Sequence, residues 1–279
     1  MITERIKQAW HRLGVLLLRI RQFFELIYKS IVRIWSFELT PCFRNLWGNE
    51  LTKELTKYKN LHQGKRIFIL ATGPSLRKED IEKLRDQITI GVNGIVTLYE
   101  DIKFKPTYYC VSDTVAVDIY KDKLIGAELD AVFWGRSCKK YEKEMNFKPV
   151  YFETVIKGSR LPFNTDRTRK NMSFHEDIYK NGVYGGGRSI VCIAMQIAAY
   201  MGASEIVLYA QDCDFTGMRT HFNNQRCDGD EASMVESMMT FFECAKEYAD
   251  KKGIKIINAT RGGKLEIFER KDLDSLIKR

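Results

Sequence analysis

The residues best suited to acid–base chemistry lie in the C-terminal half of the chain. Gln211-Asp-Cys-Asp-Phe215 ends a predicted buried strand, and Thr220-His-Phe222 follows after a short loop. Histidine has an unperturbed pKa of about 6.5, so it can accept a proton near neutral pH. We therefore name His221 and Asp214 as candidate catalytic residues, with a purely structural histidine as the open alternative.

A first turn has the composition of an anion-binding site. Thr72-Gly-Pro-Ser-Leu76 directly follows a short apolar run. Gly73 and Pro74 force a turn, and Ser75 can cap a helix predicted over 78–84. The first N–H groups of such a helix face whatever lies beyond the strand, which favours an anion there.

A second turn, Tyr184-Gly-Gly-Gly-Arg-Ser189, precedes a helix predicted over 190–201. Its glycines, among them Gly187, allow a close approach of backbone to a ligand. Arg188 offers a planar fork suited to phosphate or carboxylate, and Ser189 can cap the helix. A plain flexible turn is the alternative.

Polar side chains also follow other predicted strands. Because parallel strands present their carboxyl ends at one edge of a sheet, ligands bind there, and we expect these side chains to line a shared crevice. The candidate nucleotide- or substrate-binding residues are Thr72, Gly73, Pro74, Ser75, Asn93, Asp113, Gly187, Arg188, Ser189, Asp212 and Asn258.

The elements that must position these residues alternate between strands and helices. Strands are predicted over 66–71, 88–92, 107–111, 205–210 and 254–257, and a long amphipathic helix over 233–252. This alternation predicts an α/β fold with a Rossmann-like, mostly parallel sheet flanked by helices. Ser159–Lys170, rich in charge and turn formers, is predicted to be a lid insertion.

The order and spacing of several segments resemble the bacterial sialyltransferase family that uses CMP-sialic acid donors. The segments are Ile67-Phe-Ile-Leu-Ala-Thr-Gly-Pro-Ser-Leu76, Asn93, Gly187-Arg-Ser189 and Cys213-Asp-Phe215. The chain is also similar to the related flagellin-modifying transferases and to hydroxymethylpterin pyrophosphokinase-like proteins. The resemblance spans roughly Lys65 to Phe268.

This resemblance implies a glycosyltransferase that inverts the anomeric centre without a required metal. By similarity, the Gly73–Ser75 loop and Asn93 would hold the nucleotide, and Ser189 would touch the donor's phosphate or carboxylate. His221 would deprotonate an acceptor hydroxyl on a glycan or glycolipid. The family's loop usually has asparagine where this chain has Thr72. CMP-Kdo, another CMP-nonulosonate or a UDP-sugar therefore stays open as the donor.

Three other classes of protein compete with this interpretation. In a pyrophosphokinase-like phosphotransferase, Asp212 and Asp214 would hold Mg²⁺ through carboxylate oxygens. A membrane-bound scaffold that kept a nucleotide pocket is the non-enzymatic alternative. A nicotinamide dehydrogenase is disfavoured because the first loop lacks GxGxxG.

The N-terminal segment carries much of the chain's positive charge. Of the formal net charge of +9, the segment Met1–Trp47 contributes +5, from eight Lys/Arg and three Glu. Its apolar residues recur every three or four positions and are interrupted by arginines, so the segment is predicted to be a basic amphipathic helix rather than a spanning one. We expect residues 1–47 to lie on an anionic membrane surface; packing on the protein's own core or on a second subunit is the alternative.

The remaining features set the expected context. Seven scattered cysteines without a CxxC pair indicate reduced thiols in the cytosol. Basic residues cluster on the N-terminal helix rather than along a groove, which argues against nucleic-acid binding. We thus predict an extension over residues 1–64, a nucleotide-sugar-binding domain over 65–279, and a peripheral location at the cytoplasmic face of the inner membrane, with a homo-oligomer possible.

Overall fold

The computed structural model describes residues 19–25, 27–28, 50–155, 172–215, 221–222 and 231–277. The chain divides into two compact units, residues 1–48 with 157–166 and residues 49–156 with 167–279. Residues 49–64, predicted to be part of the extension, fall in the second unit. Within it, the 3₁₀ helix η2 (Glu50–Tyr58) buries Leu55 completely in the core. The predicted lid lies outside the described residues.

The described part of the first unit is helical over 19–25 and 27–28. Ile20, Phe23, Phe24 and Tyr28 expose their side chains, and Arg21 pairs with Glu25 one turn later. In the part of the chain that the structure describes, no helix is both long and apolar enough to cross a bilayer.

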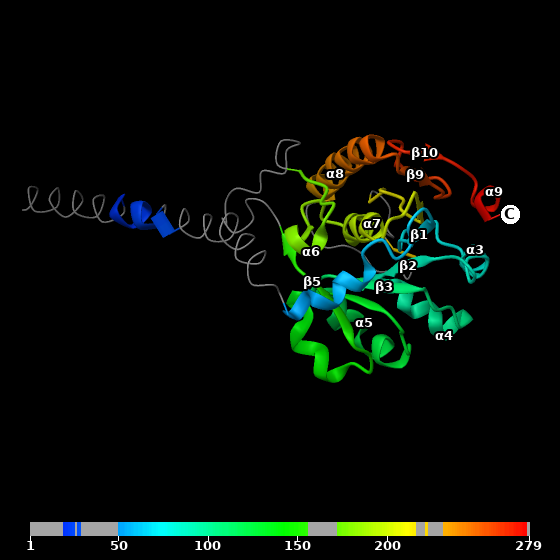
Figure 1. The fold of residues 1–279 in the computed structure, drawn as a ribbon, viewed down its shortest axis with the longest axis horizontal. Coiled ribbons are helices and arrows are strands. Elements are labelled where there is room, and N and C mark those ends of the chain that lie inside the picture. Colours follow the sequence, from blue (N-terminus) through cyan, green and yellow to red (C-terminus); the bar gives the residue numbers. More distant parts are fainter. Residues whose placement is uncertain are drawn as a thin grey trace, which may run out of the picture. The chain divides into compact units, whose positions relative to one another are not determined.

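The second unit is built on an eight-stranded parallel sheet with the order β10-β9-β8-β1-β2-β3-β4-β5 (Figure 1). The strands are β1 (Arg66–Leu70), β2 (Thr89–Val92), β3 (Tyr108–Val111), β4 (Val132–Gly135), β5 (Pro149–Phe152), β8 (Glu205–Tyr209), β9 (Lys255–Asn258) and β10 (Glu269–Arg270). A separate parallel pair joins β6 (Thr154–Val155) to β7 (Val183–Tyr184). The predicted α/β fold with a parallel sheet is confirmed.

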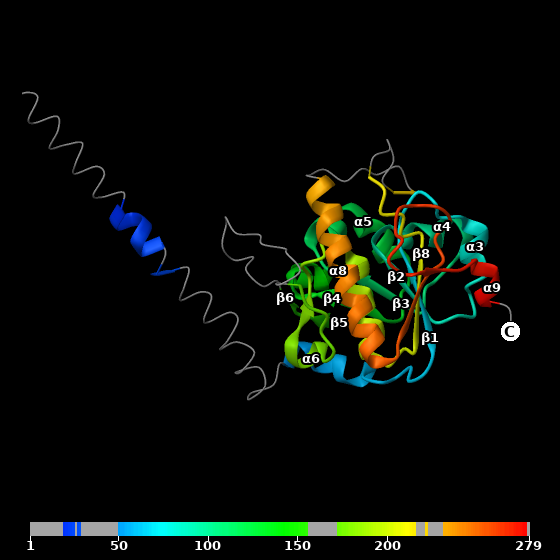
Figure 2. The same cartoon turned by 90° about the horizontal axis from the view of Figure 1, so that it is seen from above.

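Helices cover both faces of the sheet (Figure 2). One face packs against η2, α6 (Ile178–Asn181), α7 (Ile190–Tyr200) and α8 (Glu231–Lys252). The other packs against α3 (Lys78–Glu82), η3 (Asn93–Thr97), α4 (Leu98–Ile102), α5 (Thr114–Gly126), η4 (Arg136–Glu144) and α9 (Leu273–Ile277).

Strand β1 is apolar at nearly every position because it is covered on both faces of the sheet. Ile67 and Ile69 point into the core beneath α7 and α8, whereas Phe68 and Leu70 point to the opposite side. Successive side chains of a strand alternate between faces, so a strand covered on both sides must be apolar at every position.

The strand order reverses at β1. From β1 the chain runs outward through β2 to β5, and it returns to the other side of β1 with β8, β9 and β10. In open α/β sheets, such a reversal leaves a crevice beyond the carboxyl ends of the two strands that flank it. We therefore expect a ligand site at the turns after β1 and β8.

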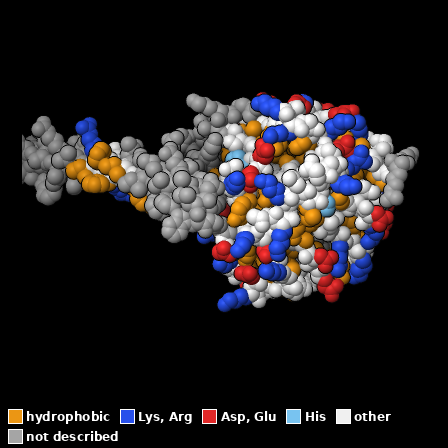
Figure 3. Space-filling model, in the orientation of Figure 1, with side chains coloured by type: hydrophobic (Ala, Val, Ile, Leu, Met, Phe, Trp, Pro, Cys, Tyr) orange, Lys and Arg blue, Asp and Glu red, His pale blue; other side chains and the backbone are white. Residues whose placement is uncertain are grey.

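On the face shown in Figure 3, Lys/Arg and Asp/Glu side chains are interspersed over the second unit. Nucleic-acid-binding domains typically gather one sign of charge along a face or a groove. On this face the two signs of charge are mixed rather than gathered into a stripe.

Candidate functional site

The turns after β1 and β8 lie in direct contact. The N–H groups of Ala71 and Gly73 donate to the carbonyls of Tyr209 and Ala210, both at 2.9 Å. A Cβ atom on Gly73 would lie 1.8 Å from Oδ2 of Asp212 and 2.4 Å from the Ala210 carbonyl oxygen. Glycine is therefore required here because the two turns approach too closely for any side chain.

Ser75 and Asp212 join these two turns by their side chains. The Ser75 hydroxyl donates to Oδ2 of Asp212 at 2.9 Å, and its N–H lies 3.5 Å from the same oxygen. Burial raises the pKa of the Asp212 carboxyl, and the hydrogen bonds from Ser75 partly offset that rise. Pro74, between these contacts, is exposed.

His221 lies over the end of β1. Its Nδ1 is 2.9 Å from the Thr72 hydroxyl, and the N–H of Phe222 donates to the Thr72 carbonyl at 2.8 Å. Burial lowers the pKa of the imidazole, and hydrogen bonding to the Thr72 backbone opposes that effect. His221 is therefore neutral near pH 7, and when Nδ1 donates to Thr72, Nε2 is the basic nitrogen.

The glycine-rich turn, residues 184–189, leads directly into α7. It lines the site together with the turns after β1 and β8. Ser189 caps α7, its hydroxyl accepting from the Val191 N–H at 3.3 Å. Gly187 packs closely, since an added Cβ would lie 2.6 Å from Sγ of Cys192. Arg188 donates to the Ser233 hydroxyl on α8 at 3.3 Å. The predicted cap is confirmed, and Arg188 is held at the edge of the cavity.

The three turns enclose a cavity of about 160 Å³, which we call the histidine cavity. Of the predicted site residues, those lining it are Thr72, Gly73, Asn93, Arg188, Ser189, Asp212, Asp214 and His221. Thr72 and His221 are 149 positions apart in sequence, so the fold brings the imidazole and the turns around it into one cavity.

A larger cavity of about 720 Å³, the wide cavity, adjoins it. Arg188, Ser189 and Ile190 line both cavities. Small-molecule sites usually measure ~300–1,000 Å³, so the histidine cavity has room for a reacting group, whereas the wide cavity has room for the body of a substrate.

Asn93 shows two signs of a ligand contact. Its backbone adopts the left-handed region at a φ of 42°, and its buried Oδ1 has no hydrogen-bond partner among the described residues. Buried polar atoms normally have partners, so this oxygen is suited to a donor on a ligand.

Backbone strain gathers at the same place. Besides Asn93, the left-handed residues Arg188, Ala210 and Cys213 line the histidine cavity. Such conformations cost about 1–3 kcal/mol each in non-glycine residues and cluster at functional sites.

Five predicted residues do not line the histidine cavity: Pro74, Ser75 and Gly187 belong to its surrounding turns, and Asp113 and Asn258 lie elsewhere. Asp113 lines the wide cavity and caps α5, where Oδ1 accepts from the Ala116 N–H at 2.9 Å. Asn258 is 1% exposed; its side chain donates to the Leu265 carbonyl at 2.8 Å and accepts from the Thr260 N–H at 2.9 Å. It holds the loop after β9, two strands away from β1.

The two aspartates considered as magnesium ligands already have protein partners. Asp212 accepts from Ser75, and Asp214 pairs with Lys264 at 2.9 Å. A cation bridging them would have to displace Lys264. Over the described ranges, no three His, Cys, Asp or Glu side chains gather closely enough to hold a metal ion.

Several residues that line the two cavities were not predicted from the sequence. The wide cavity includes Arg136, Ser137 and Glu153, and Arg136 pairs with Glu153. They follow β4 and β5, two four-residue strands that were not among the predicted ones. The histidine cavity also includes Gln211 and Met238; the only signal for Gln211 was its position at the end of β8.

Comparisons with known proteins agree with this architecture. A family model described as 6-hydroxymethylpterin diphosphokinase MptE-like matches residues 43–218. A solved MAf glycosyltransferase from Magnetospirillum magneticum AMB-1 is similar in fold, with a TM-score of 0.51 and 13% identity. The match covers 81% of this chain and 38% of that one, so this chain spans well under half of its length. A search of curated proteins found no match.

Proposed function

The chain belongs to the MptE-like family, and on that premise we propose that it is a glycosyltransferase that takes an acidic sugar from a CMP-activated donor. The acceptor would be a glycan or glycolipid. The proposal rests chiefly on one observation, a half-buried imidazole, His221, that shares a cavity with the turn after β1 and the glycine-rich turn. The similarity in fold to a glycosyltransferase supports the reaction class.

The reaction would run as a single displacement. Nε2 of His221 takes the proton of an acceptor hydroxyl while that oxygen forms a bond to the anomeric carbon. The bond between this carbon and the phosphate oxygen breaks, and the nucleotide leaves with the electron pair. Because the nucleophile enters opposite the leaving group, the anomeric centre inverts.

The remaining residues would stabilise the departing nucleotide. Arg188 supplies a cation, and the start of α7 at Ser189 supplies N–H groups and the positive end of the helix dipole. Asn93, with its unpartnered Oδ1, would accept a hydrogen bond from the nucleoside. Thr72 acts as a positioning residue by fixing the ring of His221.

His221→Ala tests the proposal. We expect transfer from CMP-sialic acid or CMP-Kdo to fall by about 10² to 10⁴, the usual contribution of a general base, while CMP affinity stays within a few-fold of wild type. His62→Ala is the matched control, because His62 bonds to the Tyr108 hydroxyl rather than to the site. Unchanged transfer in His221→Ala would reassign the base.

A diphosphokinase is the second candidate, favoured by the description of the matched family. It predicts that Mg-ATP, rather than CMP, gives a saturable calorimetric isotherm, and that EDTA abolishes activity. The glycosyltransferase proposal predicts saturable binding of CMP and transfer that persists in EDTA.

A further inference from the structure

A third cavity lies at the same edge of the sheet, beyond β9 and β10. It measures about 480 Å³, within the usual range for ligand sites, and we call it the basic cavity. Its lining contains four cationic side chains and a single carboxylate: Arg77, Arg261, Arg270, Lys271 and Asp272. Neither His221 nor the glycine-rich turn belongs to it.

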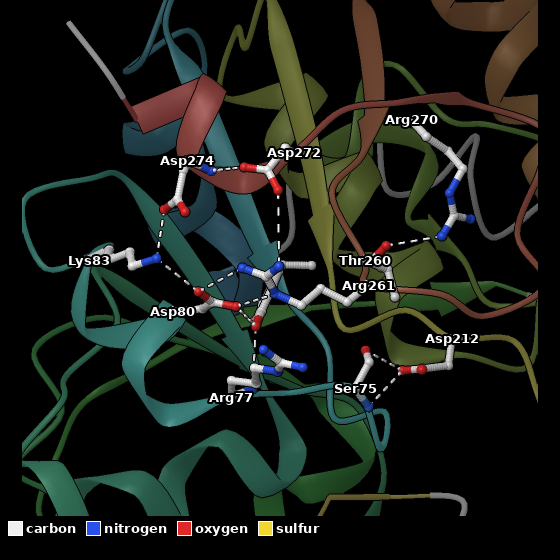
Figure 4. A network of polar contacts seen from close by, with 11 residues as sticks. Ser75, Arg77, Asp80, Lys83, Asp212, Thr260, Arg261, Arg270, Asp272 and Asp274 are labelled. Atoms are coloured by element: carbon white, nitrogen blue, oxygen red, sulfur yellow. Dashed lines mark hydrogen bonds and ion pairs between the residues drawn. The ribbon is translucent and has the colours of Figure 1, made fainter.

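Arg261 is fixed by a buried carboxylate. Its Nε and Nη2 donate to the two oxygens of Asp80 at 2.8 and 3.2 Å, and Tyr209 donates to Asp80 as well (Figure 4). The side chain of Asp80 is only 3% exposed. The remaining nitrogen, Nη1, is 4.0 Å from Asp272, which leaves it in reach of another acceptor.

Arg270 is fixed by backbone instead. Its guanidinium donates to the carbonyls of Thr260 and Leu265, both at 3.0 Å, and to that of Gly262. Figure 4 shows the guanidinium lying beside Thr260. Carbonyls do not neutralise a cation, so the positive charge of Arg270 is held in place at the cavity.

Arg270 and Lys271 also have acidic partners, but these compete only weakly with a bound anion. Glu266 and Glu269 pair with Arg270 and Lys271, but their side chains are 71% and 64% exposed. Ion pairs this exposed contribute ~0–1 kcal/mol, so a multiply charged anion can replace them. Arg77 is exposed at the rim, and its side chain makes no hydrogen bond or ion pair with the residues that the structure describes.

We propose that the basic cavity is a second anion site that binds a phosphate group, separate from the nucleotide site in the histidine cavity. Arg261 keeps its Nη1 for a phosphate oxygen and Arg270 contributes a fixed positive charge, while Arg77 and Lys271 close on the anion from the rim. Fixed donors bind without a large loss of side-chain freedom. The phosphate belongs to a soluble diphosphate or to a lipid headgroup.

The site also adjoins the histidine cavity through one loop. Arg77 follows Ser75 by two residues, and the Arg77 N–H donates to the Tyr209 hydroxyl at 3.3 Å. Figure 4 shows Ser75 with Asp212 beside the Arg77–Asp80–Arg261 network. A phosphate in the basic cavity would therefore bind next to the turn that we assign to the nucleotide.

Calorimetry with the full-length chain tests the proposal. Inorganic pyrophosphate and a soluble short-chain phosphatidic acid are titrated separately. Tighter binding of pyrophosphate would indicate a soluble diphosphate, and tighter binding of phosphatidic acid would indicate a lipid headgroup. We expect Arg77→Glu and Lys271→Glu each to weaken binding about tenfold or more, because each reverses a charge at the anion. Both side chains are exposed, so the variants should fold.

Two further variants make the outcome decisive. Lys251→Glu makes the same change of charge in the last turn of α8, near the amino end of β9. The basic cavity lies at the carboxyl ends of the strands, so this variant should leave phosphate binding unchanged. Arg188→Ala removes the cation of the histidine cavity. If phosphate binding is absent in the wild type, is lost only in Arg188→Ala, or falls equally in Lys251→Glu, the basic cavity is not a phosphate site. CMP binding, measured in parallel, reports on the histidine cavity independently.

Discussion

At the scale of single residues, the site depends on how Thr72 and burial act on His221. The resemblance drew attention to Thr72 because related loops usually have asparagine there. The structure gives the threonine a specific contact, 2.9 Å from its hydroxyl to Nδ1 of His221. The sequence could nominate both residues, but not this contact, since 149 positions separate them.

The pH dependence of transfer follows from the same burial. Burial disfavours the protonated imidazole, so the pKa of His221 lies below its ordinary value of about 6.5. The proposed base is then unprotonated throughout neutral pH, and we expect the rate of transfer to fall only as the pH drops through the lowered pKa. A profile of kcat/KM against pH, which reports the free enzyme, measures this; an acid limb centred above the ordinary histidine value would contradict it.

One residue, Asn258, was correctly predicted to lie at the end of a strand but does not line the histidine cavity. Asn258 ends β9 as predicted, yet it holds its own loop, because β9 is two strands away from β1 in the sheet. The order of strands is a tertiary property that the sequence does not display. Asn93, at the end of the strand next to β1, lies in the histidine cavity for the same reason.

At the scale of elements, long periodic segments and strands with marked ends were predictable. The predicted helices over 190–201 and 233–252 correspond to α7 and α8, and the strand before Thr72 to β1. β4 and β5 were missed because four apolar residues show no period, and β5 begins with Pro149, a residue that normally argues against a strand. The residues of the wide cavity that follow these strands, Arg136, Ser137 and Glu153, were missed with them.

Helix α7 depends on one buried amide for its attachment to the glycine-rich turn. Gln196 is 0% exposed; it accepts from the Tyr184 N–H and donates to the Tyr184 carbonyl, both at 2.9 Å. We expect Gln196→Met to lower the free energy of unfolding by about 1–3 kcal/mol for each backbone group left unpaired. Chemical denaturation measures the change.

The matched control for this substitution is Gln63→Met, at an exposed position. Surface substitutions usually change stability by less than ~0.5 kcal/mol. Equal stability of the two variants would mean that the buried amide does not fix the turn.

At the scale of the whole molecule, the N-terminal unit raises the question of location. We propose that it attaches the protein to the cytoplasmic face of the inner membrane. Ile20, Phe23, Phe24 and Ile27 recur at the three- and four-residue spacing of one helical stripe, and the surrounding segment is basic.

Sedimentation with vesicles tests this location. The full chain should sediment with vesicles of phosphatidylglycerol and not with neutral ones, and salt should weaken the binding because part of it is electrostatic. Replacing Phe23 and Phe24 by serine should reduce the bound fraction severalfold, whereas Val115→Ser and Ile119→Ser, exposed positions on α5, should not. Unchanged sedimentation of the Phe23/Phe24 variant would favour packing on a second subunit.

The claim on which the proposed function depends is that a nucleotide binds beside His221. Imidazole resonances, assigned by comparison with His221→Ala, can be followed by NMR while CMP is added. We predict that saturating CMP shifts the His221 signal and raises its pKa, because the phosphate anion stabilises the imidazolium, while the signal of His62 stays in place. Saturable CMP binding that leaves the His221 resonance and its pKa unchanged would place the nucleotide elsewhere and contradict the proposed site.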